Sequence, residues 1–244
     1  MKIRQLLIIA SAVLLLSSMI RAQAGAKPAV GQSLSVTVSS ASADSLLNGG
    51  LAAWNQIAVK RVALNRTPPL YDTDEPATLE IPRVDVRTAR ADGKLLVQLS
   101  WQDPTHDAIT LAEVPNTPPE TRFRKVQTEA DDRFFDAAAI MFPAKRGFDA
   151  IAPSLQMGDA EHLVEIYYWN ATRGAMLMQA QGRGTTRRTG QSFPVNYTYQ
   201  NGQWSVIFEL PDLPSGTTVA FAVWNGSQKD RDGRKYFSVW QVLE

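Results

Sequence analysis

The sequence predicts a mainly β fold, a two-sheet antiparallel β-sandwich with a few short helices. Several short segments alternate apolar and polar residues, which is the pattern of half-buried strands. Turn-forming pairs stand between these segments, namely Asp92-Gly93, Asn201-Gly202 and Ser215-Gly216. Long stretches with the helical period are few. The number and spacing of the alternating segments favour a sandwich of two sheets.

Eight segments are predicted to be strands because their apolar residues recur at every second position. The clearest example places Leu95, Val97, Leu99 and Trp101 on one face. In chain order, the predicted strands are residues 33–38, 95–101, 137–142, 163–169, 194–199, 204–210, 217–224 and 236–242.

Helix is expected only in short pieces, around residues 44–57 and 120–131. Residues 104–124 are rich in proline and polar side chains and exceed the usual loop length, which predicts a functional or partner-binding loop. Residues 182–191, with Arg183, Arg187 and Arg188, are expected to form an exposed hairpin connection whose charges are solvated.

The N-terminus has the composition of a secretory signal peptide. Lys2 and Arg4 precede an uncharged run over residues 6–20, and the small residues Ala22 and Ala24 follow it. This run falls short of the ~20 residues that a membrane-spanning helix needs. Since no Arg-Arg pair precedes the run, we expect export as an unfolded chain. The sequence therefore predicts a signal peptide over residues 1–24 and one mature domain over residues 25–244.

Composition excludes several classes of protein. Loss of residues 1–24 removes three basic residues and no acidic one, leaving 22 basic against 24 acidic residues and a net charge of about −2. That balance gives no electrostatic reason to expect nucleic acid or an anionic membrane as a partner. The absence of cysteine excludes disulfides, a thiol nucleophile, covalent c-type haem attachment and cysteine-ligated iron-sulfur clusters. Any cofactor must be held non-covalently.

Candidate catalytic residues are few. Asp103 and Asp136 could form the carboxylate pair of an exported hydrolase, although acidic residues at strand ends and in loops more often serve solubility. With only His106 and His162 in the chain, a three-histidine zinc site is impossible. His106 lies in a loop-like segment, whereas His162 opens an apolar strand and could ligate a metal. Neither a Gly-x-Ser-x-Gly motif nor a glycine-rich phosphate loop occurs.

Several stretches, taken in order, resemble a known family. Pro-Ser-Leu-Gln-Met-Gly-Asp at 153–159 precedes a strand that ends in Tyr-Tyr-Trp, and Val-Trp-Asn-Gly at 223–226 precedes Asp-Gly-Arg-Lys-Tyr-Phe-Ser-Val-Trp at 232–240. Further landmarks are Trp54 and residues 59–64, 99–105 and 135–143. Together they resemble the haem-binding γ subunits of type II DMSO reductase family molybdenum enzymes, which include ethylbenzene and dimethyl sulfide dehydrogenases and selenate, chlorate and nitrate reductases.

This resemblance implies a β-sandwich that holds one haem b between a methionine and a lysine, here Met157 and Lys235. It implies a periplasmic b-type cytochrome subunit that relays electrons without catalysing the substrate reaction. The implied partners are the molybdopterin catalytic subunit and the iron-sulfur subunit of the same complex, together with a soluble carrier such as cytochrome c. A neutral thioether favours ferrous iron, and a lysine ligates iron only as the neutral amine.

Other ligands and another function stay open in the sequence. Met141, Met176, Met178, Lys229 or a histidine could replace one of the two proposed ligands. The alternative function is a non-enzymatic carbohydrate-binding β-sandwich that presents its aromatic side chains as a platform. Its platform would consist of Trp54, Trp101, Trp169, Trp204, Trp224 and Trp240.

Overall fold

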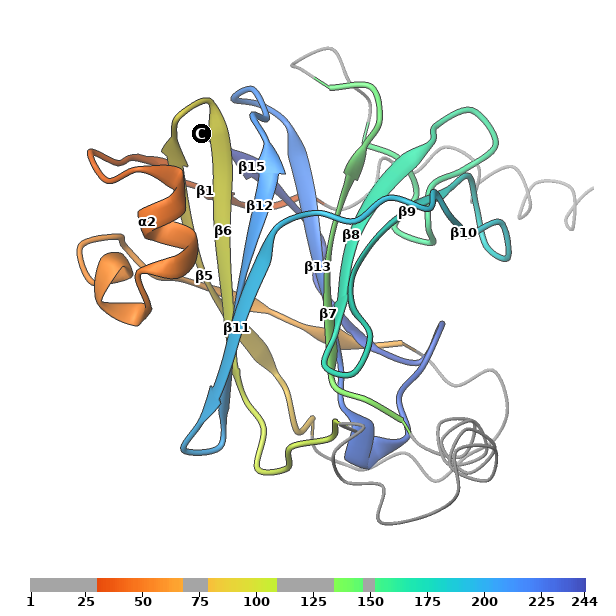
Figure 1. The fold of residues 1–244 in the computed structure, drawn as a ribbon. Helices are drawn as coiled ribbons and strands as arrows, with labels where there is room; N and C mark the ends of the chain where they lie inside the picture. Colours follow the sequence, from red (N-terminus) through yellow and green to blue (C-terminus); the bar gives the residue numbers. More distant parts are fainter. Residues whose placement is uncertain (1–29, 68–78, 109–133, 147–151) are drawn as a thin grey trace, which may run out of the picture.

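Two β-sheets pack face to face in the computed structural model (Figure 1), which describes residues 30–67, 79–108, 134–146 and 152–244. The predicted mainly β fold is confirmed. The nine-stranded sheet runs in the order β1 (Val30–Leu34), β15 (Trp240–Leu243), β13 (Thr218–Trp224), β7 (Ala137–Pro143), β8 (Val164–Asn170), β9 (Gly174–Ala180) and β10 (Arg187–Arg188), with β14 (Tyr236–Phe237) and β4 (Asn65–Arg66) attached beside β13.

The six-stranded sheet runs in the order β11 (Val195–Gln200), β12 (Gln203–Pro211), β6 (Lys94–Gln102), β5 (Arg83–Ala91) and β2 (Thr37–Val38), with β3 (Lys60–Ala63) paired to β5. Neighbouring strands of the described residues are antiparallel except at two places, where β1 lies parallel to β15 and β2 lies parallel to β5.

Six of the eight predicted strands are confirmed as single strands, with ends within one residue of the prediction. The two others are split. Residues 33–38 divide between β1 and β2 because the chain passes there from one sheet to the other. Residues 236–242 divide into β14 and β15 at Ser238, whose hydroxyl and amide both bond to the backbone of Phe221. The prediction missed β5 and β9, although β5 alternates charged and apolar residues clearly.

The space between the sheets is filled by the large apolar side chains that face inward from both. Trp101, Trp169 and Trp204 pack against one another there, with ring centroids 5.1 to 6.3 Å apart. Phe142 from β7 and Phe208 from β12 complete this layer and are fully buried. Burial of this continuous aromatic and aliphatic layer is the main force that holds the two sheets together.

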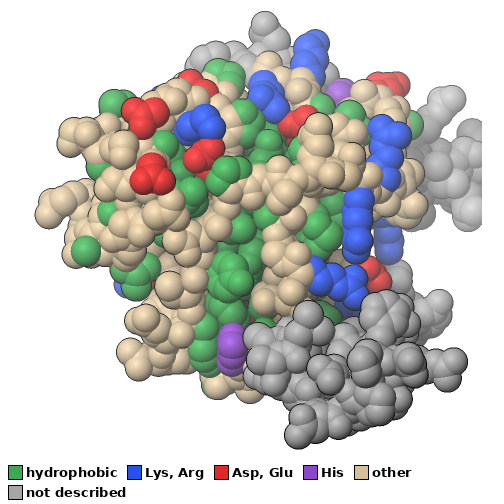
Figure 2. Space-filling view, in the orientation of Figure 1, with side chains coloured by type: hydrophobic (Ala, Val, Ile, Leu, Met, Phe, Trp, Pro, Cys, Tyr) green, Lys and Arg blue, Asp and Glu red, His purple; other side chains and the backbone are tan. Residues whose placement is uncertain are grey.

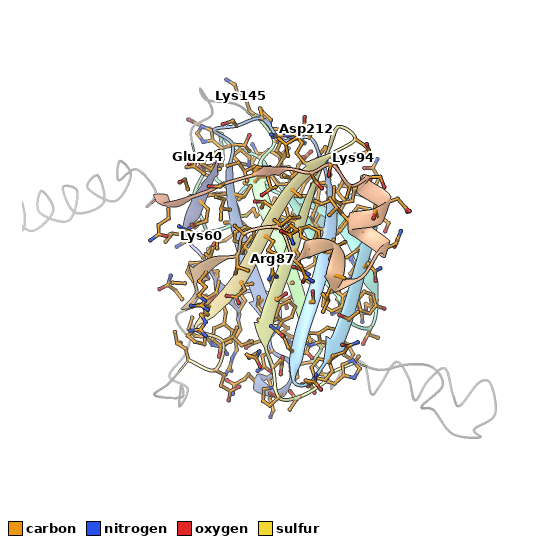
Figure 3. All side chains as sticks on the ribbon, turned by 90° about the vertical axis from the view of Figure 1, so that its left-hand side faces the viewer. Lys60, Arg87, Lys94, Lys145, Asp212 and Glu244 are labelled. Carbon is orange, nitrogen blue, oxygen red and sulfur yellow. The ribbon has the colours of Figure 1, made fainter. Side chains whose placement is uncertain are left out.

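The outer face of the six-stranded sheet is closed by a short helical segment. Helix α2 (Ala43–Asn48) and the 3-10 turn η1 (Leu51–Trp54) confirm the helix predicted over 44–57, interrupted where Gly50 adopts a φ of 74°. Leu46 and Trp54 pack onto Ala89 of β5, and the Trp54 indole donates to the Leu46 carbonyl at 2.8 Å. Figure 3 faces this side, with Arg87 of β5 labelled near its centre.

The outer face of the nine-stranded sheet is built differently, because small side chains point outward from its central strands. Ala137 and Ala139 alternate with inward Ala138 and Ile140 on β7, and β13 follows the same rule. The predicted signal peptide, the predicted helix at 120–131 and most of the loop at 104–124 lie outside the described residues. Within the described residues, no helix is long and apolar enough to cross a membrane.

Candidate functional site

A cleft of about 820 Å³ lies on the outer face of the nine-stranded sheet. Its floor includes Ile166 and Tyr168 of β8 and Met176 and Met178 of β9, four side chains that point away from the inter-sheet core. The volume falls within the ~300–1,000 Å³ typical of cofactor and ligand sites. A smaller cavity of about 30 Å³ adjoins it over β7 and β13. The side chains that line both spaces are Met157, Ile166, Trp224 and Lys235.

Met157 reaches this site from a tight turn. Its backbone lies in the left-handed region at a φ of 70°, and Gly158 follows at 82°. A Cβ at Gly158 would lie 2.6 Å from the His162 carbonyl, so this position requires glycine. Such backbone conformations cost about 1–3 kcal/mol at a residue other than glycine and are often found at functional sites. The Gly182 amide donates to the Met157 carbonyl at 2.8 Å and holds the turn against the end of β9.

Lys235 reaches the site from a second loop, directly before β14. A tight turn from Arg231 to Arg234 precedes it, closed by the amide of Arg234 donating to the carbonyl of Arg231 at 2.9 Å. The amide and hydroxyl of Thr67 donate to the Lys235 carbonyl at 3.0 and 2.9 Å. These bonds fix the backbone from which the lysine side chain enters the cleft.

A buried ion pair anchors the loop that carries Lys235. Arg66 of β4 donates from both terminal nitrogens to the two oxygens of Asp230, each at 2.6 Å. The Arg66 and Asp230 side chains are 7% and 0% exposed. The Arg66 guanidinium also lies over the Tyr236 ring, 4.5 Å from its centroid. Two-pronged pairing of this kind fixes orientation as well as distance, so the loop is held on both sides of Lys235.

Met157 and Lys235, 78 residues apart in the chain, meet in the site. The Lys235 Nζ lies 3.4 Å from the Met157 Sδ, and it also lies 5.3 Å from the centroid of the Trp224 ring. Among the described residues, this thioether is the only hydrogen-bond acceptor of the amine. Burial lowers the pKa of Lys235 to about 8, against the opposing influence of Asp232. The arrangement therefore places a soft sulfur donor beside an amine that loses its proton easily.

The alternative ligands differ in where they lie relative to the cleft. Met141 lines only the small cavity, whereas Met176 and Met178 line the cleft from β9. Lys229 is the left-handed cap of the short turn η3 (Gly226–Gln228) and is not part of either lining.

Neither histidine lines the cleft or the small cavity. The ring of His106 stacks on Tyr199, with centroids 4.8 Å apart. His162 places its Nδ1 2.6 Å from a carboxylate oxygen of Asp159. Within the described residues, no group of three or more His, Asp or Glu side chains is placed to hold a metal ion.

The two other functions weighed from the sequence fit poorly. The six tryptophans are buried, five of them at 2% exposure or less and Trp224 at 7%, so they form core and cleft wall, not an exposed platform. Asp103 and Asp136 are fully buried. Burial and the charge of Asp136 raise the pKa of Asp103 to about 7. Asp136 accepts from the Trp204 indole and the Gly226 amide, which is a structural use of this carboxylate.

Sequence reasoning missed three parts of the site. It missed the small side chains that leave room above β7 and β13. Ala139 and Ala222, at outward-facing positions of these strands, could have indicated that room. It missed the Arg66–Asp230 pair, for which no local pattern exists. It also missed that Arg183 and Arg188, which are exposed as expected, line the mouth of the cleft.

Comparison with known proteins agrees with the resemblance. The family model described as ethylbenzene dehydrogenase matches residues 52–205. A putative respiratory nitrate reductase heme subunit of Haloferax mediterranei is 30% identical over 77% of this chain, and the match spans 64% of that relative. The γ subunit of dimethylsulfide dehydrogenase from Rhodovulum sulfidophilum is 30% identical over 76% of this chain and 70% of its own length.

The γ subunit of chlorate reductase from Ideonella dechloratans is 25% identical, over 78% of this chain and 77% of the relative. The region that the family model matches contains strands β3 to β11 and includes Met157, whereas Lys235 lies beyond its end. The family model and the relatives agree on the family. The chain belongs to the ethylbenzene dehydrogenase family of γ subunits.

Proposed function

We propose that this chain is a b-type cytochrome subunit that relays electrons between the iron-sulfur subunit of a molybdenum oxidoreductase complex and a soluble carrier such as cytochrome c. The relatives carry the names of haem and γ subunits of nitrate reductase, chlorate reductase and dimethylsulfide dehydrogenase. The observation that carries the proposal is the Met157–Lys235 pair at the base of a cleft large enough for a cofactor.

The donor set fits haem iron. A thioether is a neutral, soft donor, and an amine with a lowered pKa gives up its proton more readily than an exposed lysine, as coordination of iron requires. The two atoms come from separate loops, one from the 153–159 turn and the other from the 231–235 loop. Neither residue belongs to a strand of the rigid sheet, so both would be able to move to admit a metal. Met157 and Lys235 are therefore the proposed axial ligands.

The walls of the cleft also fit a porphyrin. Ile166, Met176, Met178 and Trp224 offer apolar surface for a flat macrocycle, and burial of that surface would supply most of the affinity. No cysteine exists in the chain, which excludes covalent c-type attachment and supports a non-covalent haem of the b type. When bound, haem supplies an iron that exchanges single electrons. With Met157 and Lys235 both bound to the iron, no position would remain open for substrate, so electron transfer is the expected role.

The N-terminal sequence and the names of the relatives support the proposed cellular setting. The predicted signal peptide at 1–24 supports a periplasmic location, with haem inserted after export. The relatives' assignment as γ subunits supports a complex with a molybdopterin catalytic subunit and an iron-sulfur subunit. The substrate and the direction of electron flow belong to those partner subunits.

The visible spectrum of the exported protein, produced with adequate haem supply, tests the proposal. We expect a Soret band, a six-coordinate low-spin spectrum in both oxidation states, and a pyridine haemochrome of the b type. Acidified organic solvent should extract the colour completely because no thioether bond holds it. A colourless protein that also fails to take up added haem would contradict the proposal, and colour retained by the precipitated chain would contradict the b-type assignment.

A further inference from the structure

One side of the cleft mouth is strongly basic. Four arginines from three separate segments line it. They are Arg173 in the turn between β8 and β9, Arg183 before β10, Arg188 within β10, and Arg231 in the loop before Lys235. Figure 2 shows basic side chains gathered along the side of the molecule where β9 and β10 lie. The remainder of the lining is mainly apolar or uncharged, so the cleft has a polar end and an apolar interior.

These positive charges are not neutralised within the site. Asp230 lines the cleft but is engaged by Arg66 and Arg234. Asp232 lies 4.0 Å from Arg231, and both side chains are mostly exposed, so this contact is weak. Within the described residues, Arg173, Arg183 and Arg188 form no ion pair. The mouth of the cleft therefore has an excess of positive charge and several free guanidinium donors.

Two of the arginines line the cleft together with a half-buried polar group. Arg173 and Arg188 both act electrostatically on the Tyr168 hydroxyl, which lies on the cleft floor and whose pKa is raised by burial. The same hydroxyl accepts from the Asn170 amide at 3.2 Å, so its proton remains available for donation outward. An anion at this end of the cleft would meet two guanidinium groups and a phenol together.

We propose that Arg173 and Arg188, with Tyr168, bind the propionate carboxylates of the haem, while Arg183 and Arg231 extend the same basic rim. This inference rests on the proposed haem function and adds the orientation of the cofactor, with its carboxylate edge toward β9 and β10. Guanidinium groups recognise carboxylates through paired, charge-assisted hydrogen bonds. The apolar edge of the macrocycle then faces Trp224 and the alanines of β7 and β13.

Neighbouring residues supply a matched control. Arg187 and Arg188 are the two residues of β10, so their side chains leave the strand on opposite faces. Arg188 lines the cleft, whereas Arg187 does not and lies near the Gln179 side chain instead. Substitution of each by glutamine removes the same charge from the same strand, and only one change should affect the cofactor.

The test compares haem b with its dimethyl ester, which has the same iron and macrocycle but no carboxylate charge. The haem-free full chain is titrated with each at low salt, and binding is followed in the Soret band. We expect the wild-type chain to prefer haem by roughly tenfold or more, the scale of one good charge-assisted contact. R173Q/R188Q should lose most of that preference while binding the ester as the wild type does, and R187Q should keep it.

Each other outcome decides the question. Equal binding of haem and ester by the wild-type chain would overturn the propionate site and leave the arginines as a docking surface for an acidic partner protein. Loss of ester binding in R173Q/R188Q would show that the two substitutions together damage the cleft itself. The single variants R173Q and R188Q, with their folding checked by circular dichroism, would then be compared by the ratio of their affinities for haem and for the ester. Failure of the wild-type chain to bind either compound would instead contradict the haem function.

Discussion

The two outer faces of this sandwich have similar small residues on their strands but are covered by different segments. Ala89 on the six-stranded sheet and Ala222 on the nine-stranded sheet both point outward from a central strand. Over Ala89, the side chains of Leu46 and Trp54 pack into one buried cluster. Over Ala222, the loops that carry Met157 and Lys235 leave a cavity and a cleft. Small strand residues provide room, and the covering segment decides whether that room becomes core or binding site.

The largest effect on stability is expected on the closed face. Trp54→Ala removes a side chain that is 1% exposed and leaves a large cavity beneath α2. Its cost should be about 3–5 kcal/mol of unfolding free energy, the usual range for a buried tryptophan. Denaturant unfolding measures this, with haem affinity of the folded protein as the second readout. A Trp54→Ala protein that keeps its stability but loses haem would reverse the assignment of the two faces.

The same substitution made on both faces should separate packing from binding. Ala89→Leu inserts bulk into a filled core and should cost about 1–3 kcal/mol without affecting the cofactor. Ala222→Leu projects into the cavity that Met157 and Lys235 border, so it should cost less stability and yet lower haem affinity by roughly tenfold or more. Unfolding curves and haem titrations of the two variants give both quantities. Identical behaviour of the pair would remove the distinction between a closed and an open face.

The two faces differ in how much of their structure could be predicted from the sequence. Alternation predicted six strands well, and the short helical piece expected around 44–57 is present as α2 and η1. No local pattern shows which face a helix will cover, since that depends on contacts such as Leu46 with Ile207 across the chain. Likewise the pairing of Arg66 with Asp230 joins residues 164 positions apart. The proposed ligands came from family resemblance, not from spacing.

The acidic cluster between the sheets at one end of the sandwich provides a pH test that involves neither outer face. The pKa of Asp103 is raised in the folded protein to about 7, mainly by burial and then by the charge of Asp136. The folded state therefore binds this proton more tightly than the unfolded state does. Its contribution to stability is greatest below about pH 4 and is lost as pH rises toward 7.

Asp103→Asn should remove this dependence and raise the unfolding free energy above pH 7 by roughly 1–2 kcal/mol, because a neutral amide replaces a buried charge. Thermal unfolding at several pH values, with Asp85→Asn on β5 as the control, measures the effect. Unchanged pH dependence in Asp103→Asn would show that Asp103 titrates normally in the folded protein.

A smaller effect is expected from the contact that positions Lys235. Thr67→Val removes the hydroxyl that donates to the Lys235 carbonyl at 2.9 Å and leaves the backbone bond in place. The loss should be about 1 kcal/mol of stability, with a measurable rise in the dissociation rate of haem. Thr37→Val on β2, a threonine outside the cleft lining, is the matched control. Equal dissociation rates in both variants would argue against a positioning role.

The central claim, that Met157 and Lys235 hold the haem on the open face, is tested most directly by the spin state of ferric iron in two lysine variants. Lys235 lines the cleft and Lys229, six residues earlier, does not. Electron paramagnetic resonance and absorption spectra of the haem-loaded protein should show low-spin iron in the wild type and in Lys229→Ala, and high-spin iron in Lys235→Ala. Low-spin iron retained in Lys235→Ala but lost in Lys229→Ala, or in a variant of His106 or His162, would contradict the ligand assignment.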